Sequence, residues 1–142
     1  MEGNYLHSNI TSEIIKAFYE VYNKLGYGFL EKVYQNALLI ELRKIYLDCK
    51  PAYPIDVYYE GQKIGFYIAD IILENSVIIE IKAAESLCEE HEAQLVNYLR
   101  ATDIEVGILL NFGKKLSFKR KVFSKQYKYL QSEENPKRSS SS

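Results

Sequence analysis

The sequence has 142 residues, of which 47% are hydrophobic, so it is long enough to bury a sizeable core and is expected to form one globular domain. The formal net charge of −1 excludes an overall basic field that would attract nucleic acid, so any basic surface must be local. The two cysteines match neither a zinc site nor a secreted disulfide framework, and no apolar run reaches the length of a signal-peptide core or a membrane span. These observations predict a cytoplasmic protein that does not bind a membrane.

Two segments near the N-terminus have the apolar spacing of amphipathic helices. Apolar side chains recur every three or four positions over residues 10–25 and again over about 29–46, which places them on one face of each helix. Asn9 or Thr11 is expected to cap the first helix. Gly26 follows that helix at the place where a left-handed residue commonly ends one.

Beyond these helices the period of the apolar residues changes to two, which is typical of strands. Turn-forming residues at 60–62 and 74–76 divide residues 50–83 into three strands. Helical spacing returns over 85–102, and two further strands follow it. The first is a continuous apolar run that ends at Phe112, and the second alternates like an edge strand.

The resulting order, ααβββαββ, predicts an α+β fold, an α/β sandwich in which helices flank a mixed β-sheet. We expect residues 1–130 to form this single domain. The segment 131–142 is rich in serine and in charged residues, and is expected to be a disordered tail.

Three charged side chains, Asp70, Glu80 and Lys82, lie within the otherwise apolar segment 69–83. Glu80 and Lys82 share one face of a strand. A three-residue loop at 74–76 would pair Asp70 directly with Glu80, whereas a two-residue turn at 75–76 would place Asp70 opposite Ile81. Two opposed carboxylates repel each other unless a cation lies between them, and a hard divalent ion such as Mg²⁺ prefers such oxygen ligands. In the alternative interpretation, Asp70 ends a turn while Glu80 and Lys82 form an ion pair.

Four segments in order resemble the GxxExxY family of the PD-(D/E)xK nuclease superfamily. They are "LGYGFLEKVYQNAL", which holds Gly28, Glu31 and Tyr34 in the GxxExxY spacing, then "ADIILENSVIIEIKA", "HEAQLVNYLRAT" and "VGILLNFG". The resemblance extends from about residue 11 to residue 122. It implies a restriction-endonuclease-like core and a metal-dependent nuclease that hydrolyses phosphodiester bonds, in DNA in preference to RNA.

By this resemblance, Asp70, Glu80 and Lys82 occupy the catalytic positions. The two carboxylates and the carbonyl of Ile81 would hold Mg²⁺ or Mn²⁺, and Glu31 is a candidate additional carboxylate. Glu31 also lies in the first turn of its helix, where the helix dipole favours a carboxylate whatever its function.

Gln94 and Tyr98 match a Gln-x-x-x-Tyr element that accompanies exonuclease-like members of the superfamily. They lie on one stripe of a helix with His91, and they would orient the substrate or the lysine. The alternative is that Gln94 and Tyr98 are hydrogen-bonded core residues. His91 is interpreted as a residue of the helix face near the helix start.

A nuclease must hold a polyanion, and residues 114–128 carry seven basic residues and no acidic ones. The candidate nucleic-acid-binding residues are Lys114, Lys115, Lys119, Arg120 and Lys121. Natural edge strands also use lysines to remain soluble, and the two interpretations are not exclusive.

A second class of function also fits the sequence. A nuclease-like fold retained as a non-catalytic module would bind nucleic acid or protein without turnover, and the near-neutral charge suits such a module or a subunit of a larger complex. A homodimer is also compatible with the sequence, and a purely structural interaction protein is the third option. Metal binding discriminates between these classes, because a non-catalytic module has no reason to bind Mn²⁺ through Asp70 and Glu80.

Overall fold

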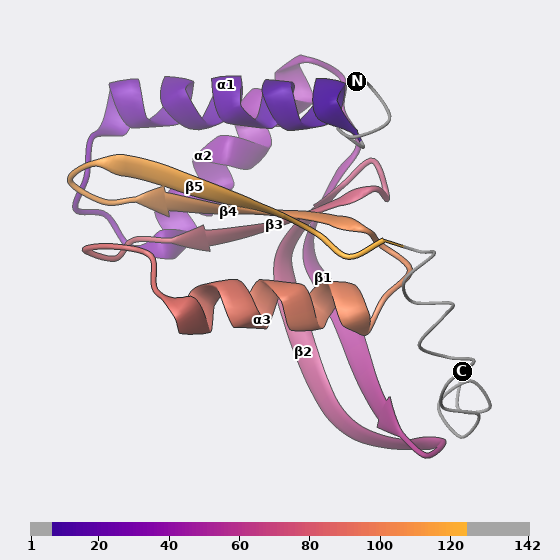
Figure 1. Cartoon of the computed structure of the whole chain (residues 1–142). Coiled ribbons are helices and arrows are strands. Elements are labelled where there is room, and N and C mark those ends of the chain that lie inside the picture. The colour runs from indigo at the N-terminus through magenta and orange to yellow at the C-terminus, as the bar shows by residue number, and fades with distance from the viewer. Residues whose placement is uncertain (1–6, 125–142) are drawn as a thin grey trace.

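The computed structural model describes residues 7–124, in which a five-stranded mixed sheet lies between two helical layers (Figure 1). The elements are α1 (Ser8–Leu25), α2 (Glu31–Lys44), β1 (Cys49–Tyr59), β2 (Gln62–Leu73), β3 (Val77–Lys82), α3 (Glu89–Arg100), β4 (Val106–Phe112) and β5 (Leu116–Val122). The predicted order and the α+β class are confirmed. The predicted tail at 131–142 lies outside the described residues.

The strands lie in the sheet in chain order, with β1 and β5 at its edges. Neighbouring strands pair antiparallel except β3 and β4, which are parallel because α3 carries the chain from one to the other. The loop at 74–76 and the pairing of Ile71 with Ile79 match the predicted register. The edge position that was predicted for β5 is also confirmed.

Helix α1 begins earlier than its sequence signals predict. Asn9 and Thr11 lie within the helix instead of capping it, and the residue before the helix is His7, with φ of 57°. The Thr11 hydroxyl donates to the His7 carbonyl at 3.0 Å, so it is used within the first turn. At the other end, Gly26 has φ of 70° and its N–H donates to the Tyr22 carbonyl, as expected for a C-terminal glycine.

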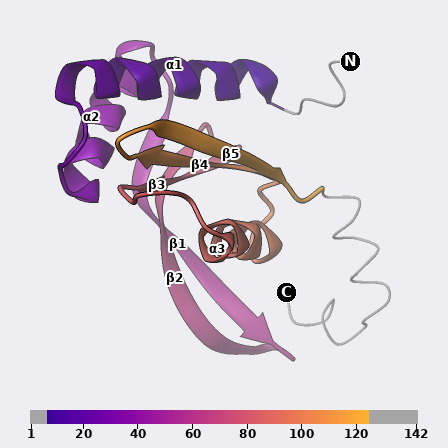
Figure 2. The ribbon, with the colours of Figure 1, turned by 60° about the vertical axis from the view of Figure 1, so that its left-hand side comes forward.

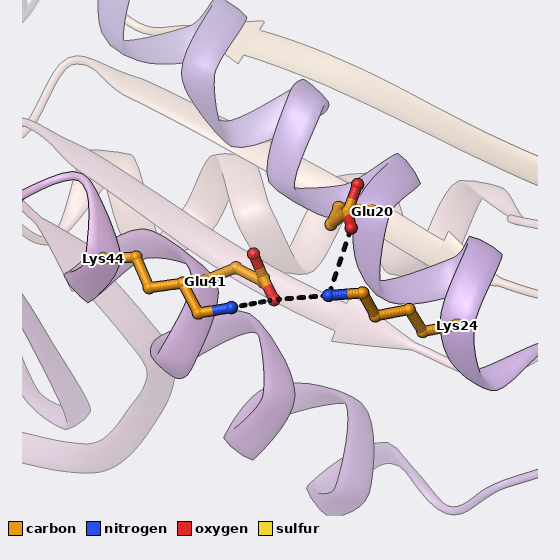
Figure 3. A network of polar contacts seen from close by, with 4 residues as sticks. All are labelled: Glu20, Lys24, Glu41 and Lys44. Carbon is orange, nitrogen blue, oxygen red and sulfur yellow. Dashed lines mark hydrogen bonds and ion pairs between the residues drawn. The ribbon is translucent and has the colours of Figure 1, made fainter.

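The helices α1 and α2 are linked at their surface by a chain of ion pairs (Figure 3). Lys24 of α1 lies 3.2 Å from Glu20 and 3.7 Å from Glu41 of α2, and Lys44 approaches the same Glu41 carboxylate at 3.1 Å. Exposed ion pairs of this kind contribute little to the free energy of unfolding, so the apolar core beneath them supplies most of the stability.

The sheet separates two apolar cores. On the face covered by α1 and α2, the core includes Phe18, Leu38, Ile79 and Leu110, all fully buried. On the α3 face, the core includes Ile55, Ile78, Leu95, Leu99 and Leu109. β3 and β4 lie in the middle of the sheet and contribute to both cores, which explains why their sequences are almost continuously apolar.

The long β1–β2 hairpin changes its direction partway along its length. Ile71 and Leu73 pack on the α1 and α2 face, whereas Ala69 packs on the α3 face, so the alternation of side chains is interrupted at Asp70. Ala52, which lies opposite in β1, has φ of 56°. The free end of the hairpin extends beyond α3 in both views (Figures 1 and 2). This bend separates β2 from β3 at Asp70.

Candidate active site

The first feature of the site is a pair of crossed hydrogen bonds where β2 leaves β3. The paired ladder ends at Ile71 and Ile79, and beyond it two carboxylates take the place of carbonyl acceptors. The Asp70 N–H donates to Glu80 Oε2 at 2.7 Å, and the Ile81 N–H donates to Asp70 Oδ2 at 2.8 Å. The predicted direct ladder pair of Asp70 and Glu80 is thus replaced by side-chain contacts, because the strands have already diverged.

Glu80 and Lys82 lie on the face of the sheet that α3 covers. They alternate along β3 with Ile79 and Ile81, which pack in the opposite core. Glu80 is 5% exposed, whereas Lys82 is half-buried at the end of the strand. The shared face predicted for these two residues is therefore present.

Burial controls the electrostatics of the carboxylate pair. It raises the pKa of Glu80 to about 8, and the nearby charge of Asp70 acts in the same direction. Burial also raises the pKa of Asp70, although the hydrogen bond from the Ile81 N–H opposes this shift. The charge of Lys82 lowers the pKa of both carboxyl groups without cancelling the effect of burial. Without a cation, the pair therefore retains a proton near neutral pH.

Helix α3 brings the predicted Gln94 and Tyr98 to the α3 face of the sheet. Tyr98 is buried, and its pKa is raised to about 12, first by burial and then by the charges of Glu80 and Asp70. Gln94 is half-buried one turn earlier on the same helix. His91 accepts a hydrogen bond from the Cys88 N–H at the start of α3, so it has the structural role that its position predicts.

Glu31 approaches the site from α2, on the other side of the sheet. It is exposed in the first turn of that helix, and its charge raises the pKa of both Asp70 and Glu80. Over the described chain, 7–124, no three His, Cys, Asp or Glu side chains are grouped closely enough to hold one ion. Asp70 and Glu80 are therefore a pair, and Glu31 acts on them from a longer distance.

Gln35 supports the site, although the sequence did not predict it as a site residue. Its side-chain amide donates to the Asp70 carbonyl at 3.1 Å, and the side chain is almost completely buried. The contact fixes the main chain of Asp70 to α2 at the point where β2 bends. In the sequence, the only indication that Gln35 supports the site is its place directly after the tyrosine of the GxxExxY pattern.

The residues of the GxxExxY pattern build the turn that precedes α2. Tyr34 is fully buried, and its hydroxyl donates to the Gly26 carbonyl at 2.6 Å and accepts from the Phe29 N–H at 3.2 Å. Gly28 has φ of 113°, which side-chain-bearing residues rarely adopt. The tyrosine and the glycine thus fix the path of the turn, and Glu31 follows it in the first turn of the helix.

Asn111 fixes the chain that follows Lys82. Its side chain is fully buried, accepts from the Ala84 N–H at 2.9 Å and donates to the Ala84 carbonyl at 3.0 Å. Gly113 packs against the same carbonyl, since a Cβ there would lie 2.6 Å from it. Between these two residues, Phe112 stacks on the Tyr34 ring with centroids 4.2 Å apart. A lone asparagine in the apolar run "GILLNFG" was the sequence signal for this role.

A cleft of about 590 Å³ opens between the turn that precedes α2 and the chain that follows Lys82. Residues 27–31, 83–85 and 112–114 line it. Glu31 belongs to this lining, and Ala83 directly follows Lys82, whereas Asp70, Glu80 and Lys82 themselves do not line the cleft.

The basic residues of the C-terminal hairpin do not form one surface. Lys114 and Lys115 lie in the turn between β4 and β5, and the Lys114 ammonium is 5.8 Å from the centre of the Tyr27 ring at the cleft. Lys114 therefore lines the cleft, and Lys115 follows it in the same turn. Residues 125–128 of the basic segment lie outside the described residues.

The basic residues of β5 are divided between the two faces of the sheet. Because Phe123 packs in the α3-side core, Lys119 and Lys121 lie on that same face by alternation. Lys121 forms an ion pair with Glu92 of α3 at 2.6 Å. Arg120 lies on the opposite face. The candidate nucleic-acid-binding residues of β5 thus lie on different faces, and their binding role stays a prediction.

A mixed sheet with two acidic side chains and a lysine where two strands diverge is the arrangement of restriction-endonuclease-like domains. A family model described as the PD-(D/E)XK nuclease superfamily matches residues 8–122, and the chain belongs to this superfamily. Members of the superfamily are generally nucleases and typically use divalent metals. No helix in residues 7–124 is long and apolar enough to cross a membrane.

Comparison with solved structures supports the fold. Three chains match, and one of them is the crystal structure of SSO0001, with a TM-score of 0.53 and 21% sequence identity. The match covers 73% of this chain and 56% of that chain, so this chain spans a little over half the length of that protein. No curated protein matches the sequence.

Proposed function

We propose that this chain is a metal-dependent nuclease of the GxxExxY type that hydrolyses phosphodiester bonds in DNA, and in RNA with lower preference. One observation carries the proposal: buried Glu80 and half-buried Asp70 are joined by crossed hydrogen bonds, and Lys82 shares the face of Glu80 on β3. Burying two carboxyl groups together is costly, as their raised pKa values indicate, unless a cation or a proton accompanies them.

The donor set fits a hard divalent cation. Mg²⁺ and Mn²⁺ prefer oxygen ligands, and Mg²⁺ typically takes one or two carboxylates together with water and substrate oxygens. Asp70, Glu80 and the carbonyl of Ile81 would hold the ion. The carbonyl is suited to this role because the N–H and C=O of one residue point to the same side of a strand, and the Ile81 N–H already points to Asp70. Glu31 would orient the site from α2.

A bound divalent cation supplies two effects, an acidified water molecule and an offset to the negative charge that develops on the phosphate. The protein's own residues do the rest. Lys82 would position the attacking water or stabilise the same charge, as preorganised cations do in water-poor sites. Gln94 and Tyr98 would orient the substrate or the lysine from α3, and Lys114 and Lys115 would contact the phosphate backbone.

Metal-dependent melting combined with cleavage tests the proposal. Mn²⁺ should raise the melting temperature of the wild-type protein by linkage to the folded state, and should leave that of Asp70→Asn unchanged. Asp56→Asn is the matched control, because Asp56 is an exposed aspartate of the same hairpin. Plasmid, linear duplex, single-stranded DNA and RNA should be cleaved with Mn²⁺ and left intact with EDTA.

The main alternative is a non-catalytic module that binds nucleic acid or protein. Nucleic-acid binding without any metal-dependent cleavage, together with equal Mn²⁺ shifts in all three proteins, would support that alternative and reject the nuclease assignment.

A further inference from the structure

The cleft lined by residues 27–31, 83–85 and 112–114 combines aromatic rings with carboxylates, unlike the carboxylate pair itself. We propose that it binds one unpaired nucleobase of the substrate, next to the phosphodiester that is cleaved, so that the protein prefers single-stranded or frayed nucleic acid. This inference rests on the proposed nuclease function and adds to it the form of the substrate.

The location of the cleft connects it to the candidate catalytic residues. Glu31 lines the cleft and also acts electrostatically on Asp70 and Glu80. Ala83, on the opposite wall, is the residue after Lys82. A group in the cleft would therefore be a close neighbour of a phosphate held between the carboxylate pair and the lysine.

Aromatic rings dominate the apolar part of the lining. Phe112 is almost completely buried and forms the floor, whereas Tyr27 and Phe29 are 56% and 45% exposed and form the mouth. Exposed rings at a concave site are typical stacking partners for bases, since every base has a flat π-face. The volume of about 590 Å³ is within the range of small-ligand pockets.

The charges of the lining favour a base over a phosphate. Glu31 and Glu85 contribute two carboxylates, and Lys114 contributes one ammonium group. The local balance is therefore negative, which repels a phosphate inside the cleft. Carboxylates accept hydrogen bonds from exocyclic amino groups, as Glu and Asp do from the N4 of cytosine. Adenine, cytosine and guanine carry such groups and thymine does not.

The walls of the cleft are held in place by buried contacts. Tyr34 fixes the turn at 27–29 through its two hydrogen bonds, and Asn111 fixes Ala84 through two more. The stack of Tyr34 on Phe112 joins the walls. Walls that are fixed in this way lower the ordering cost of binding. A base inside a duplex cannot enter it unless the base leaves the stack.

Binding measurements on the full chain test the proposal. Fluorescence anisotropy in Ca²⁺ should compare labelled oligo(dA), oligo(dT) and a mixed-sequence duplex, with wild type, Tyr27→Ala and the control Tyr19→Ala. Tyr19 is 46% exposed on α1 and is not part of the cleft. Wild type should bind oligo(dA) more tightly than the other two ligands. Tyr27→Ala should weaken oligo(dA) binding by about fivefold or more and leave the duplex unchanged, while Tyr19→Ala changes neither.

A second readout separates stacking from general attraction. 2-Aminopurine in a single strand should change its fluorescence on binding to wild type and lose this change with Tyr27→Ala or Phe29→Ala. Equal loss of oligo(dA) and duplex binding, or no loss in either variant, would overturn the proposed base site. Metal-dependent cleavage without a single-strand preference would overturn this inference alone, whereas absence of both cleavage and nucleic-acid binding would overturn the nuclease proposal as well.

Discussion

Glu80 shows how strongly one residue depends on its surroundings. Its pKa stands near 8 first because the side chain is buried and only then because Asp70 lies beside it. An ordinary glutamate would be ionised at neutral pH, but this one keeps its proton until a cation replaces it. The affinity of the proposed site for a metal ion should therefore rise with pH up to about 8, because the carboxyl group of Glu80 must lose its proton to bind the ion.

The raised pKa of Glu80 predicts how stability depends on pH in EDTA. The pKa of Glu80 is 4.5 in the unfolded chain and about 8 in the folded protein. Between these two pH values the folded protein therefore binds more protons than the unfolded chain does. The contribution of Glu80 is therefore fully present below pH 4.5 and is lost as the pH rises through about 8. Thermal denaturation should show wild type losing more stability over this interval than Glu80→Gln.

Glu20→Gln serves as the control for that series, because Glu20 is an exposed glutamate of α1 and should leave the pH dependence unchanged. Identical pH profiles for wild type and Glu80→Gln would mean that Glu80 is ionised in the folded protein throughout.

Lys82 is assigned to the reaction itself and not to the cation. Lys82→Ala should abolish cleavage while the Mn²⁺-induced rise in melting temperature remains, because the two carboxylates are untouched. Lys44→Ala, which removes an exposed lysine at the end of α2, should keep full activity. Cleavage assays and melting curves in Mn²⁺ decide the point, and normal turnover by Lys82→Ala would remove this residue from the mechanism.

At the scale of the elements, the site is assembled from the ends of strands and the start of a helix. β2 and β3 supply the carboxylates where they diverge, α2 supplies Gln35 and Glu31, and α3 supplies Tyr98. Main-chain bends and buried side-chain amides hold these ends together. The site should therefore be sensitive to changes in residues that touch no substrate.

Asn111 provides the test of that dependence. Asn111→Ala removes the hydrogen-bond partner of both the N–H and the carbonyl of the half-buried Ala84, and each lost hydrogen bond costs about 0.5–1.5 kcal/mol. We expect a lower melting temperature and reduced cleavage, with the Mn²⁺ shift retained. Asn97→Ala, at an exposed position of α3, is the control and should change none of these. Unaltered stability of Asn111→Ala in denaturant titration would contradict the role of this residue.

At the scale of the whole molecule, the distribution of charge decides how nucleic acid approaches. With a net charge of −1, binding depends on where the lysines lie and not on their number. Lys114 and Lys115 are at the turn beside the cleft, whereas Lys119 and Lys121 face α3, and Lys121 is already paired with Glu92. The turn lysines are therefore better placed to contact a strand that enters the site.

The salt dependence of binding can distinguish the two groups of lysines. Changing Lys114 and Lys115 to Gln should lower the slope of the logarithm of the binding constant against the logarithm of the salt concentration. The expected change is about one unit for each phosphate contact that is lost. Changing Lys119 and Lys121 to Gln should lower it less, because Lys121 already has a partner. A reduced slope confined to the second pair would instead assign nucleic-acid binding to the α3 face.

The sequence by itself determined the elements and the central pair of acids. Periods of 3.6 and 2 are local properties, so they predicted the order ααβββαββ. Turn-forming residues located the loop at 74–76, and the structure shows the three-residue alternative. Asp70 and Glu80 are ten positions apart on one hairpin, so the hairpin brings them close, but side chains make the contact because β2 and β3 diverge beyond Ile71 and Ile79. The start of α1 was predicted wrongly because Asn9 and Thr11 are ordinary capping residues that the chain uses inside the helix.

Only the tertiary structure decided which residues hold the site in place. Gln35 reaches Asp70 across 35 positions and Asn111 reaches Ala84 across 27, and no local pattern specifies such partners. The division of the basic segment between two faces depended in the same way on where Phe123 is buried. Hydrophobic periodicity predicts that a side chain is buried. A buried polar group, however, needs one particular hydrogen-bond partner, and the packing of distant elements supplies that partner.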